Sequence, residues 1–326
     1  MSESTALNDH LKKGIEHLKA NRYNDAIIEL KQVAKTYPDS YEVWSSLGLA
    51  YRKAELVKKA FDSYQKALEI NPRSIDALHN LGSLYYQRKD FAKALSCFEN
   101  AVKIDPSNAQ SWGYLGWYNG QVGLYQKSLE CLNKAIELEP SNIKTLNNLG
   151  MSHFELRNYS EAIKNFERAV LIDPKYYLGF SNLGLVYLEL RDYANAITEY
   201  KAAIKLKPDN QTLWNNLAQS YAESGNFDEA IKSLKTAIKL NTNSASPWHN
   251  LGVTYARFGN HYEAIKSFKK VVSILPQCQS SWRNLGYSYL QIKNYSQAIK
   301  SFLKSIKLDP KDPGSWAELS SLPRAR

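Results

Sequence analysis

Prolines recur at a fixed interval of 34 residues along almost the whole of this 326-residue chain. They stand at 38, 72, 106, 140, 174, 208, 276 and 310, and the one vacant place on this lattice is occupied by Thr242. A period of roughly 20 to 50 residues is typical of chains built from repeated supersecondary units. With the proline counted as position 32, the chain contains nine repeats, which are residues 7–40, 41–74, 75–108, 109–142, 143–176, 177–210, 211–244, 245–278 and 279–312.

Each repeat carries two groups of apolar or small residues separated by a polar break. The second repeat has Trp44, Leu47, Gly48, Tyr51, Ala60, Tyr64, Ala67 and Pro72 at positions 4, 7, 8, 11, 20, 24, 27 and 32. Within each group the spacing is helical. A proline disfavours the α region for the residue before it and so ends the second helix. Each repeat is therefore predicted to be a pair of antiparallel helices, helix A followed by helix B.

This pattern resembles the tetratricopeptide repeat family, whose signature is W-x2-L-G-x2-Y, then A-x3-F, then P. The resemblance recurs in register through residues 7–312. It implies an all-α fold, a right-handed α-solenoid of nine helix-turn-helix repeats with residues 313–326 as a partial C-terminal cap. Neighbouring repeats supply the core, because no single pair can bury both of its faces. The resemblance also implies that residues 1–326 form one superhelical domain.

The face of helix A opposite the core is the candidate partner-binding surface. At about 100° per residue, positions 2, 5, 6, 9, 12 and 13 lie opposite the core positions, and in the resembled family this face lines the concave groove. Position 6 is asparagine in six repeats: Asn80, Asn148, Asn182, Asn216, Asn250 and Asn284. Carboxamides donate and accept hydrogen bonds, so such a ladder can hold the backbone of an extended peptide. It resembles the ladder of O-linked N-acetylglucosamine transferases and cargo adaptors; alternatively, asparagine is simply common at this position.

Apolar residues on the same face give a second set of candidates for partner binding. They are Tyr86, Tyr114, Trp117, Met151, Phe154 and Leu185. Aromatic anchors carry much of the binding energy of protein interfaces, so we expect Trp117 and its neighbours to hold an apolar side chain of the partner. The alternative is that some of these rings pack against adjacent A helices.

Four glycines interrupt the helix that contains Trp117, in the segment "SWGYLGWYNGQVG". Gly116 occupies position 8, where a small residue lets helices A and B approach closely. Gly123, at position 15, is predicted to lie in the turn between the helices. Gly113 and Gly120 flank Trp117, so this segment is the best candidate for a pocket that reads a side chain.

Two further patterns bear on the partner. Position 13 carries Glu155, Glu189 and Glu223, which form either an acidic rim favouring basic partners or a solvated edge. Chaperone adaptors of the resembled family hold a C-terminal carboxylate with a lysine at position 5, and no repeat here has one. The sequence therefore argues against binding of chaperone tails.

Positive charge is concentrated in the last third of the chain. Residues 231–326 hold 15 Lys and Arg against 4 Asp and Glu, whereas residues 1–230 hold 27 against 28. Several lysines occupy outward positions 22, 25 and 29 of helix B: Lys232, Lys235, Lys239, Lys266, Lys269, Lys300 and Lys307. This stripe could meet an acidic protein, anionic lipid or nucleic acid, or be a solvated face. No aromatic RNA-binding signature accompanies it, which disfavours nucleic acid.

Catalytic and metal-binding motifs are missing. The histidines form no H-E-x-x-H, and no phosphate-binding glycine loop follows a strand. Cys97 and Cys131 occupy equivalent positions in adjacent repeats and are interpreted as structural thiols. No apolar run could span a membrane and no secretory leader is visible, so a cytoplasmic protein is expected.

We therefore predict a non-catalytic scaffold with no cofactor, metal or small-molecule substrate, which binds a protein or peptide partner; the oligomeric state stays open. The alternatives are the substrate-selecting arm of a larger, glycosyltransferase-like enzyme, and an adaptor that uses its basic convex face.

Overall fold

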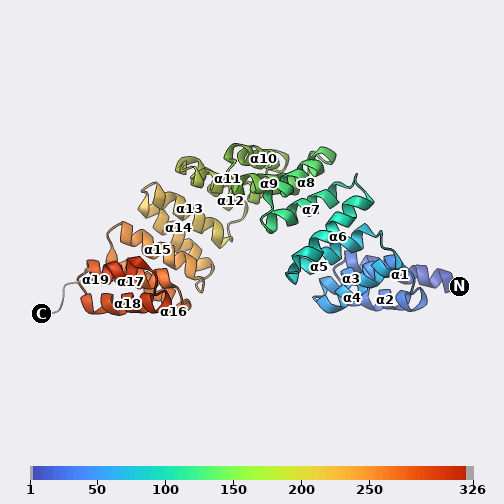
Figure 1. Cartoon of the computed structure of the whole chain (residues 1–326), viewed down its shortest axis with the longest axis horizontal. Helices are drawn as coiled ribbons and strands as arrows, with labels where there is room; N and C mark the ends of the chain where they lie inside the picture. The colour runs from blue at the N-terminus through green and yellow to red at the C-terminus, as the bar shows by residue number, and fades with distance from the viewer. Residues whose placement is uncertain (1–2, 321–326) are drawn as a thin grey trace. The chain divides into compact units, whose positions relative to one another are not determined.

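The computed structural model describes residues 3–320, which form nineteen α-helices and no strand (Figure 1). The helices are α1 Glu3–Lys19, α2 Tyr23–Thr36, α3 Tyr41–Lys53, α4 Val57–Ile70, α5 Ile75–Gln87, α6 Phe91–Ile104, α7 Ala109–Gln121, α8 Tyr125–Leu138, α9 Ile143–Glu155, α10 Tyr159–Ile172, α11 Tyr177–Glu189, α12 Tyr193–Leu206, α13 Gln211–Glu223, α14 Phe227–Leu240, α15 Ala245–Arg257, α16 His261–Ile274, α17 Gln279–Gln291, α18 Tyr295–Leu308 and α19 Pro313–Ser320.

The first eighteen helices pair as the sequence predicts, with odd-numbered helices as A and even-numbered helices as B of nine repeats. The predicted all-α solenoid of helix pairs is confirmed. The chain divides into two compact units, residues 1–165 and residues 166–326; that it is one domain stays a prediction. In the described part of the chain, no helix has the length and apolar character needed to cross a membrane.

Polar side chains cap the first turn of several helices. Asn108 and Asn142 precede α7 and α9, and their side chains accept hydrogen bonds from the amides of Ser111 and Thr145 at 2.9 and 3.0 Å. Such caps satisfy amides that the first helical turn leaves without partners. The same arrangement occurs at B helices, where the Asp90 carboxylate caps α6. The start of each of these three helices is thus encoded locally.

A left-handed residue at position 15 ends helix A in all nine repeats. These residues are Asn21, Glu55, Lys89, Gly123, Arg157, Arg191, Gly225, Gly259 and Lys293, with φ between 58° and 82°. The prediction that Gly123 lies in the turn is confirmed. Only glycine adopts this conformation without steric cost, so six of the nine turns carry backbone strain.

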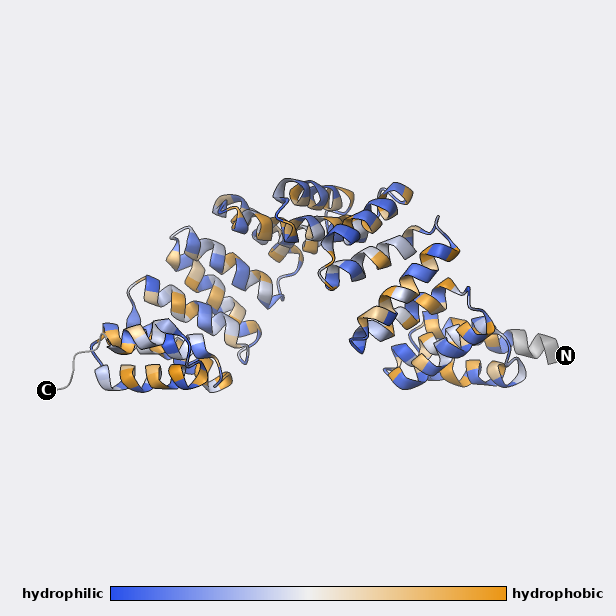
Figure 2. Ribbon diagram, in the orientation of Figure 1, coloured by the Kyte–Doolittle hydropathy of each residue, from blue (hydrophilic) through white to orange (hydrophobic). Residues whose placement is uncertain are grey.

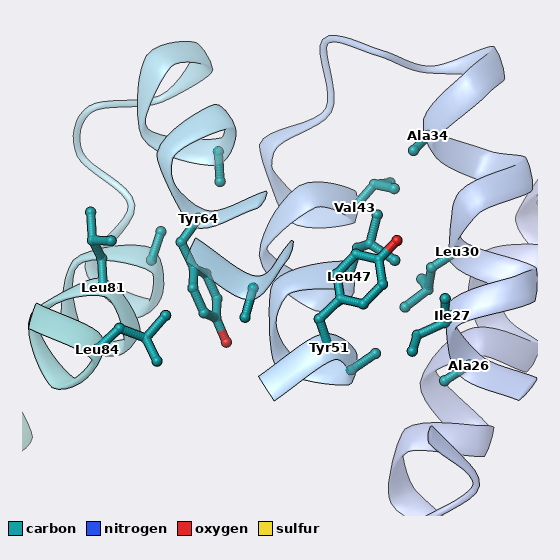
Figure 3. Close-up of a cluster of buried hydrophobic side chains, with 14 of the residues drawn as sticks. Ala26, Ile27, Leu30, Ala34, Val43, Leu47, Tyr51, Tyr64, Leu81 and Leu84 are labelled. Carbon is teal, nitrogen blue, oxygen red and sulfur yellow. The ribbon is translucent and has the colours of Figure 1, made fainter. Parts of the chain in front are cut away.

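Helices A and B approach closely at position 8. A Cβ added at Gly116 would lie 2.5 Å from the Leu132 side chain, and one added at Gly286 would lie 2.7 Å from the Phe302 ring. These distances are shorter than real contacts allow, so at these two sites an added Cβ would displace its neighbour, whereas the seventh repeat accommodates the buried Ala218 at position 8. The core that results runs through successive helices, as in the cluster formed by Leu30, Leu47, Tyr64 and Leu84 (Figure 3).

Where position 4 is tryptophan, its indole joins the repeat to the one before it. The indole Nε1 of Trp112 donates a hydrogen bond to the carbonyl of Pro106 at 2.9 Å, and Trp282 does the same with Pro276. Trp248 donates to the carbonyl of Thr242, the one non-proline on the lattice, at 3.2 Å. The proline and tryptophan of the signature are therefore linked through the backbone carbonyl of position 32.

A and B helices occupy different sides of each unit. Neighbouring A helices contact each other, as α5 does with α7 and α15 with α17, whereas among the described residues of either unit no neighbouring B helices do. The A helices thus line the side on which repeats lie closest, and the B helices form the outer side. Hydrophilic and hydrophobic residues alternate along both kinds of helix (Figure 2).

The ends of the described chain depart from the repeat pattern. Lys13, which replaces the usual core leucine, is exposed on α1. At the other end, α19 supplies a short tenth A helix, and Trp316 donates to the carbonyl of Pro310 at 3.0 Å, in register with the other repeats. Residues 321–326 of the predicted cap lie outside the described residues.

Candidate functional site

The A-helix side of the first unit carries a group of rings from α5, α6 and α7, which we call the α5–α7 aromatic cluster. Its members are His79, Tyr86, Phe98, Tyr114, Trp117 and Tyr118. The centroids of Tyr118 and Phe98 are 4.4 Å apart, and Tyr118 also contacts Tyr86 edge-on at 4.7 Å. Such pairs stabilise a cluster beyond the area that they bury. Phe98 and Tyr118 are buried and form its base.

Trp117, the central candidate of the sequence analysis, is half-buried at the edge of this cluster. Its ring lies 5.7 Å from Tyr86 and 4.5 Å from Tyr118, so one side of the indole is already covered. Tyr86 is also half-buried and its hydroxyl donates to the Gln121 Oε1 at 3.3 Å. Tyr114 is 36% exposed. The structure thus brings three predicted residues together, and the alternative that their rings pack against adjacent A helices holds in part. That they bind a partner stays a prediction.

Gly113 and Gly120 lie against side chains of neighbouring helices, and only the approach at Gly120 is tight. A Cβ added at Gly120 would lie 3.2 Å from the Ser128 hydroxyl of α8, and one at Gly113 would lie 3.5 Å from the Thr145 hydroxyl of α9. Both Cβ directions thus meet side chains of other helices, and a pocket around Trp117 stays a prediction.

A buried polar network behind this segment escaped the sequence analysis. The Ser128 hydroxyl lies 2.7 Å from the Gly116 carbonyl and 2.8 Å from the Ser152 hydroxyl, and Asn119 donates to the Leu115 carbonyl at 2.9 Å. Asn119 replaces the tyrosine that six other repeats place at position 11, and Ser128 replaces the alanine that all other repeats place at position 20. The replacement of both positions in one repeat was the sequence signal that could have revealed this polar network.

The predicted apolar residues beyond Trp117 are also partly covered. Met151 and Phe154 are half-buried on α9, and the Phe154 ring lies 5.8 Å from that of Tyr159. In the second unit Leu185 is half-buried on α11. Each therefore offers a limited apolar surface on the A-helix side of its own unit.

The six predicted asparagines are all half-buried, and several already have partners. Asn80 donates from Nδ2 to the Asp76 carbonyl of its own helix at 2.8 Å, and Asn250 donates to the Asn215 Oδ1 at 2.9 Å. The Asn216 side chain faces the Tyr200 hydroxyl. Burial raises the pKa of this hydroxyl, and the contact with Asn216 offsets part of the rise. An amide group retains further hydrogen-bonding capacity after one such bond. Asn148 and Asn284 lie at the same position of α9 and α17.

The predicted acidic rim is partly neutralised. Glu223 pairs with Arg257 of the next A helix at 2.7 Å, and Glu155 accepts a hydrogen bond from the Tyr125 hydroxyl at 3.4 Å. Both glutamates remain exposed. The Arg257 contact lowers the negative potential available to a basic partner in the second unit.

Two histidines, the buried His79 and the half-buried His249, join adjacent A helices by similar contacts. The His79 Nε2 lies 2.9 Å from the Ser111 hydroxyl, and the His249 Nδ1 lies 2.6 Å from that of Ser281. Burial lowers the pKa of His79 to about 4 and also lowers that of His249. Both rings are therefore neutral near pH 7 and serve packing between repeats.

Chemically reactive groups are dispersed. Cys97 and Cys131 are free and buried, and burial raises the pKa of each thiol to about 11. Among the described residues, no group of three or more His, Cys, Asp or Glu side chains could hold a metal ion. The arrangement on the A helices offers ring surfaces and amide groups, which are recognition groups.

Comparisons with known proteins agree with the repeat architecture. Family models described as tetratricopeptide repeat match residues 11–75, 75–108, 109–142, 143–176, 181–246, 215–277 and 280–312. Among solved structures, the chain is similar to a crystal structure of MamA protein at 25% identity, which covers 53% of this chain and 95% of that one with a TM-score of 0.47. A second crystal structure of MamA shows 26% identity over 50% of this chain and 95% of that one, with a TM-score of 0.46. No curated protein matches the sequence.

Proposed function

Because the chain belongs to the tetratricopeptide repeat family, a scaffold fold for protein–protein interaction, we propose that it binds an extended peptide segment of a partner along its A helices. The observation that carries this proposal is the partly exposed set of rings formed by Tyr86, Tyr114 and Trp117. Rings held by neighbours lose little conformational entropy on binding, which makes them effective anchors.

The asparagines supply the second half of the proposal. In the second unit, Asn216, Asn250 and Asn284 occupy equivalent positions of α13, α15 and α17. We infer that, within the second unit, their remaining amide groups hold the backbone of a bound segment; within the first unit, the α5–α7 aromatic cluster holds an apolar side chain. Amides read the backbone without selecting side chains, so the cluster supplies the selectivity.

We further propose that the chain acts without catalysis, cofactor or metal, binds no small-molecule substrate or nucleic acid, and works in the cytoplasm. The dispersal of its thiols and histidines supports the first part of this statement. The half-buried rings and amides of the A helices are suited to recognition, because they donate, accept and pack but do not transfer protons readily.

Peptides selected from a random library against the full chain provide the test. Trp117→Ala is expected to weaken the selected peptides about tenfold or more, as loss of an anchor does. The control is Tyr37→Ala, which removes a ring that is 46% exposed outside the A-helix surface. Unchanged affinity in the Trp117 variant, with thermal unfolding like wild type, would contradict the proposal.

A further inference from the structure

Three successive B helices of the second unit carry lysines on the outer side. Helices α14, α16 and α18 contain nine lysines and three carboxylates. All nine lysines are exposed: Lys232, Lys235, Lys239, Lys266, Lys269, Lys270, Lys300, Lys304 and Lys307. We call this surface the α14–α18 basic face. The outer helix α8 of the first unit, in contrast, balances two lysines with two glutamates.

Most of this positive charge is not neutralised. Lys232 pairs with Glu229 and Lys266 with Glu263, each within one turn of its own helix. In the described part of the chain the other seven lysines make no ion pair, and α18 contains no acidic residue. Unpaired like charges on one face repel each other and draw anions to that face.

Apolar side chains stand exposed among these lysines. Tyr262 on α16 is 69% exposed and Leu303 on α18 is 50% exposed. Leu303 follows Lys300 by three residues and precedes Lys307 by four, so the three side chains share one face of the helix. Tyr262 stands in the same relation to Lys266. The lysines and apolar groups therefore point to the same side.

We propose that the α14–α18 basic face binds the surface of a bilayer that contains anionic phospholipids. The lysines lie among the head groups, and Tyr262 and Leu303 enter the boundary between head groups and acyl chains. Lysines flanking exposed aromatic and aliphatic residues are characteristic of helices that lie on membranes. The proposal goes beyond peptide binding, because it uses the B helices and leaves the A helices open.

The apolar residues favour a bilayer over other anions. Phosphates of a nucleic acid would pair with the lysines but leave Tyr262 and Leu303 in water. One acidic peptide strand would meet only part of a charge array that extends over three helices. A bilayer surface satisfies both the charge and the apolar groups.

Co-sedimentation of the full chain with phosphatidylcholine vesicles, with and without phosphatidylserine, tests this proposal. Wild type is expected to bind only vesicles that contain phosphatidylserine, and less at high salt. Replacing Lys270, Lys300 and Lys307 with Gln is expected to lower the partition coefficient about fivefold per lysine, or about a hundredfold in total. The control replaces Lys103, Lys127 and Lys134 of α6 and α8 with Gln, which removes equal charge elsewhere.

A second variant separates a bilayer from other polyanions. Tyr262→Ser with Leu303→Ser keeps every charge and is expected to weaken vesicle binding about tenfold, while retention on heparin stays unchanged. Equal vesicle binding by wild type and this variant would overturn the proposal, as would equal losses in the two triple-lysine variants. Trp117→Ala should bind vesicles like wild type, so failure of peptide binding can be told apart from failure here.

Discussion

At the scale of single residues, the turn at position 15 requires a left-handed backbone conformation, yet six of the nine repeats place a residue other than glycine there. The left-handed conformation costs an L-residue about 1 to 2 kcal/mol, and Lys89 adopts it with φ of 61°. Where glycine occupies this position, as at Gly225, a Cβ would meet nothing within 4 Å. The strain is therefore one of backbone conformation alone.

We predict that Lys89→Gly raises the free energy of unfolding by about 0.5 to 1 kcal/mol. Relief of the left-handed conformation outweighs the added entropy of glycine in the unfolded chain. Thermal unfolding of the purified chain measures the change. The same substitution at the exposed Lys235, inside α14, serves as the control and is expected to cost about 1 kcal/mol. A loss of stability in both variants would show that position 15 is not strained.

At the scale of elements, the carbonyl at position 32 binds the indole of the following helix A wherever that helix has a tryptophan at position 4. Thr242 supplies this carbonyl to Trp248 without being proline. The residue before it, Asn241, has extended backbone angles of φ −152° and ψ 101°, which a following proline favours. The backbone of Asn241, between the repeat α13–α14 and the repeat α15–α16, thus already has the conformation that a proline at position 242 favours.

Thr242→Pro is accordingly expected to stabilise the chain by about 0.4 to 1 kcal/mol, because proline restricts the unfolded chain at a compatible site. The rise in midpoint temperature checks it. Asn243→Pro, one residue later, is the control and is expected to destabilise. Destabilisation by Thr242→Pro would mean that the vacancy in the lattice has a structural cause.

The histidine–serine contacts between A helices make stability depend on pH. Burial holds the pKa of His79 at about 4 in the folded chain, below its ordinary value of about 6.5. Between pH 6.5 and pH 4 the unfolded chain binds this proton more readily than the folded chain does. The free energy of unfolding therefore falls as the pH drops through this range.

His79→Gln removes this titration and keeps a side chain that can bond to Ser111. Between pH 7 and pH 4.5, wild type is expected to lose about 2 to 3 kcal/mol more stability than the variant. Denaturant unfolding at the two pH values measures the difference. Parallel losses in the two proteins would contradict the buried, neutral state of this ring.

At the scale of the whole chain, periodicity explains why the architecture was predictable. Residues such as Pro106 and Gly116 recur at the same position in eight of the nine repeats, so the sequence alone predicts nine helix pairs and their close approach. The turn predicted at Gly123 occurs at position 15 of all nine repeats, although only three of these turns contain the glycine that signals it.

The candidate site was less predictable because exposure depends on neighbours from other repeats. Trp117 lies on the expected face, yet Tyr86 of the preceding repeat covers one side of its ring. Asn250 lies on that face as well, yet it bonds to Asn215 from the preceding A helix. Helical periodicity gives the direction of a side chain, and packing decides how much of it remains free.

Hydroxyl-radical footprinting of the full chain, with and without a bound library-selected peptide, tests the central claim most directly. The account predicts that oxidation of Tyr86, Tyr114 and Trp117 falls when the peptide binds, while oxidation of Tyr37 and Tyr262, outside the A-helix surface, is unchanged. Protection of Tyr262, with the rings of the α5–α7 aromatic cluster oxidised as in the free chain, would contradict it.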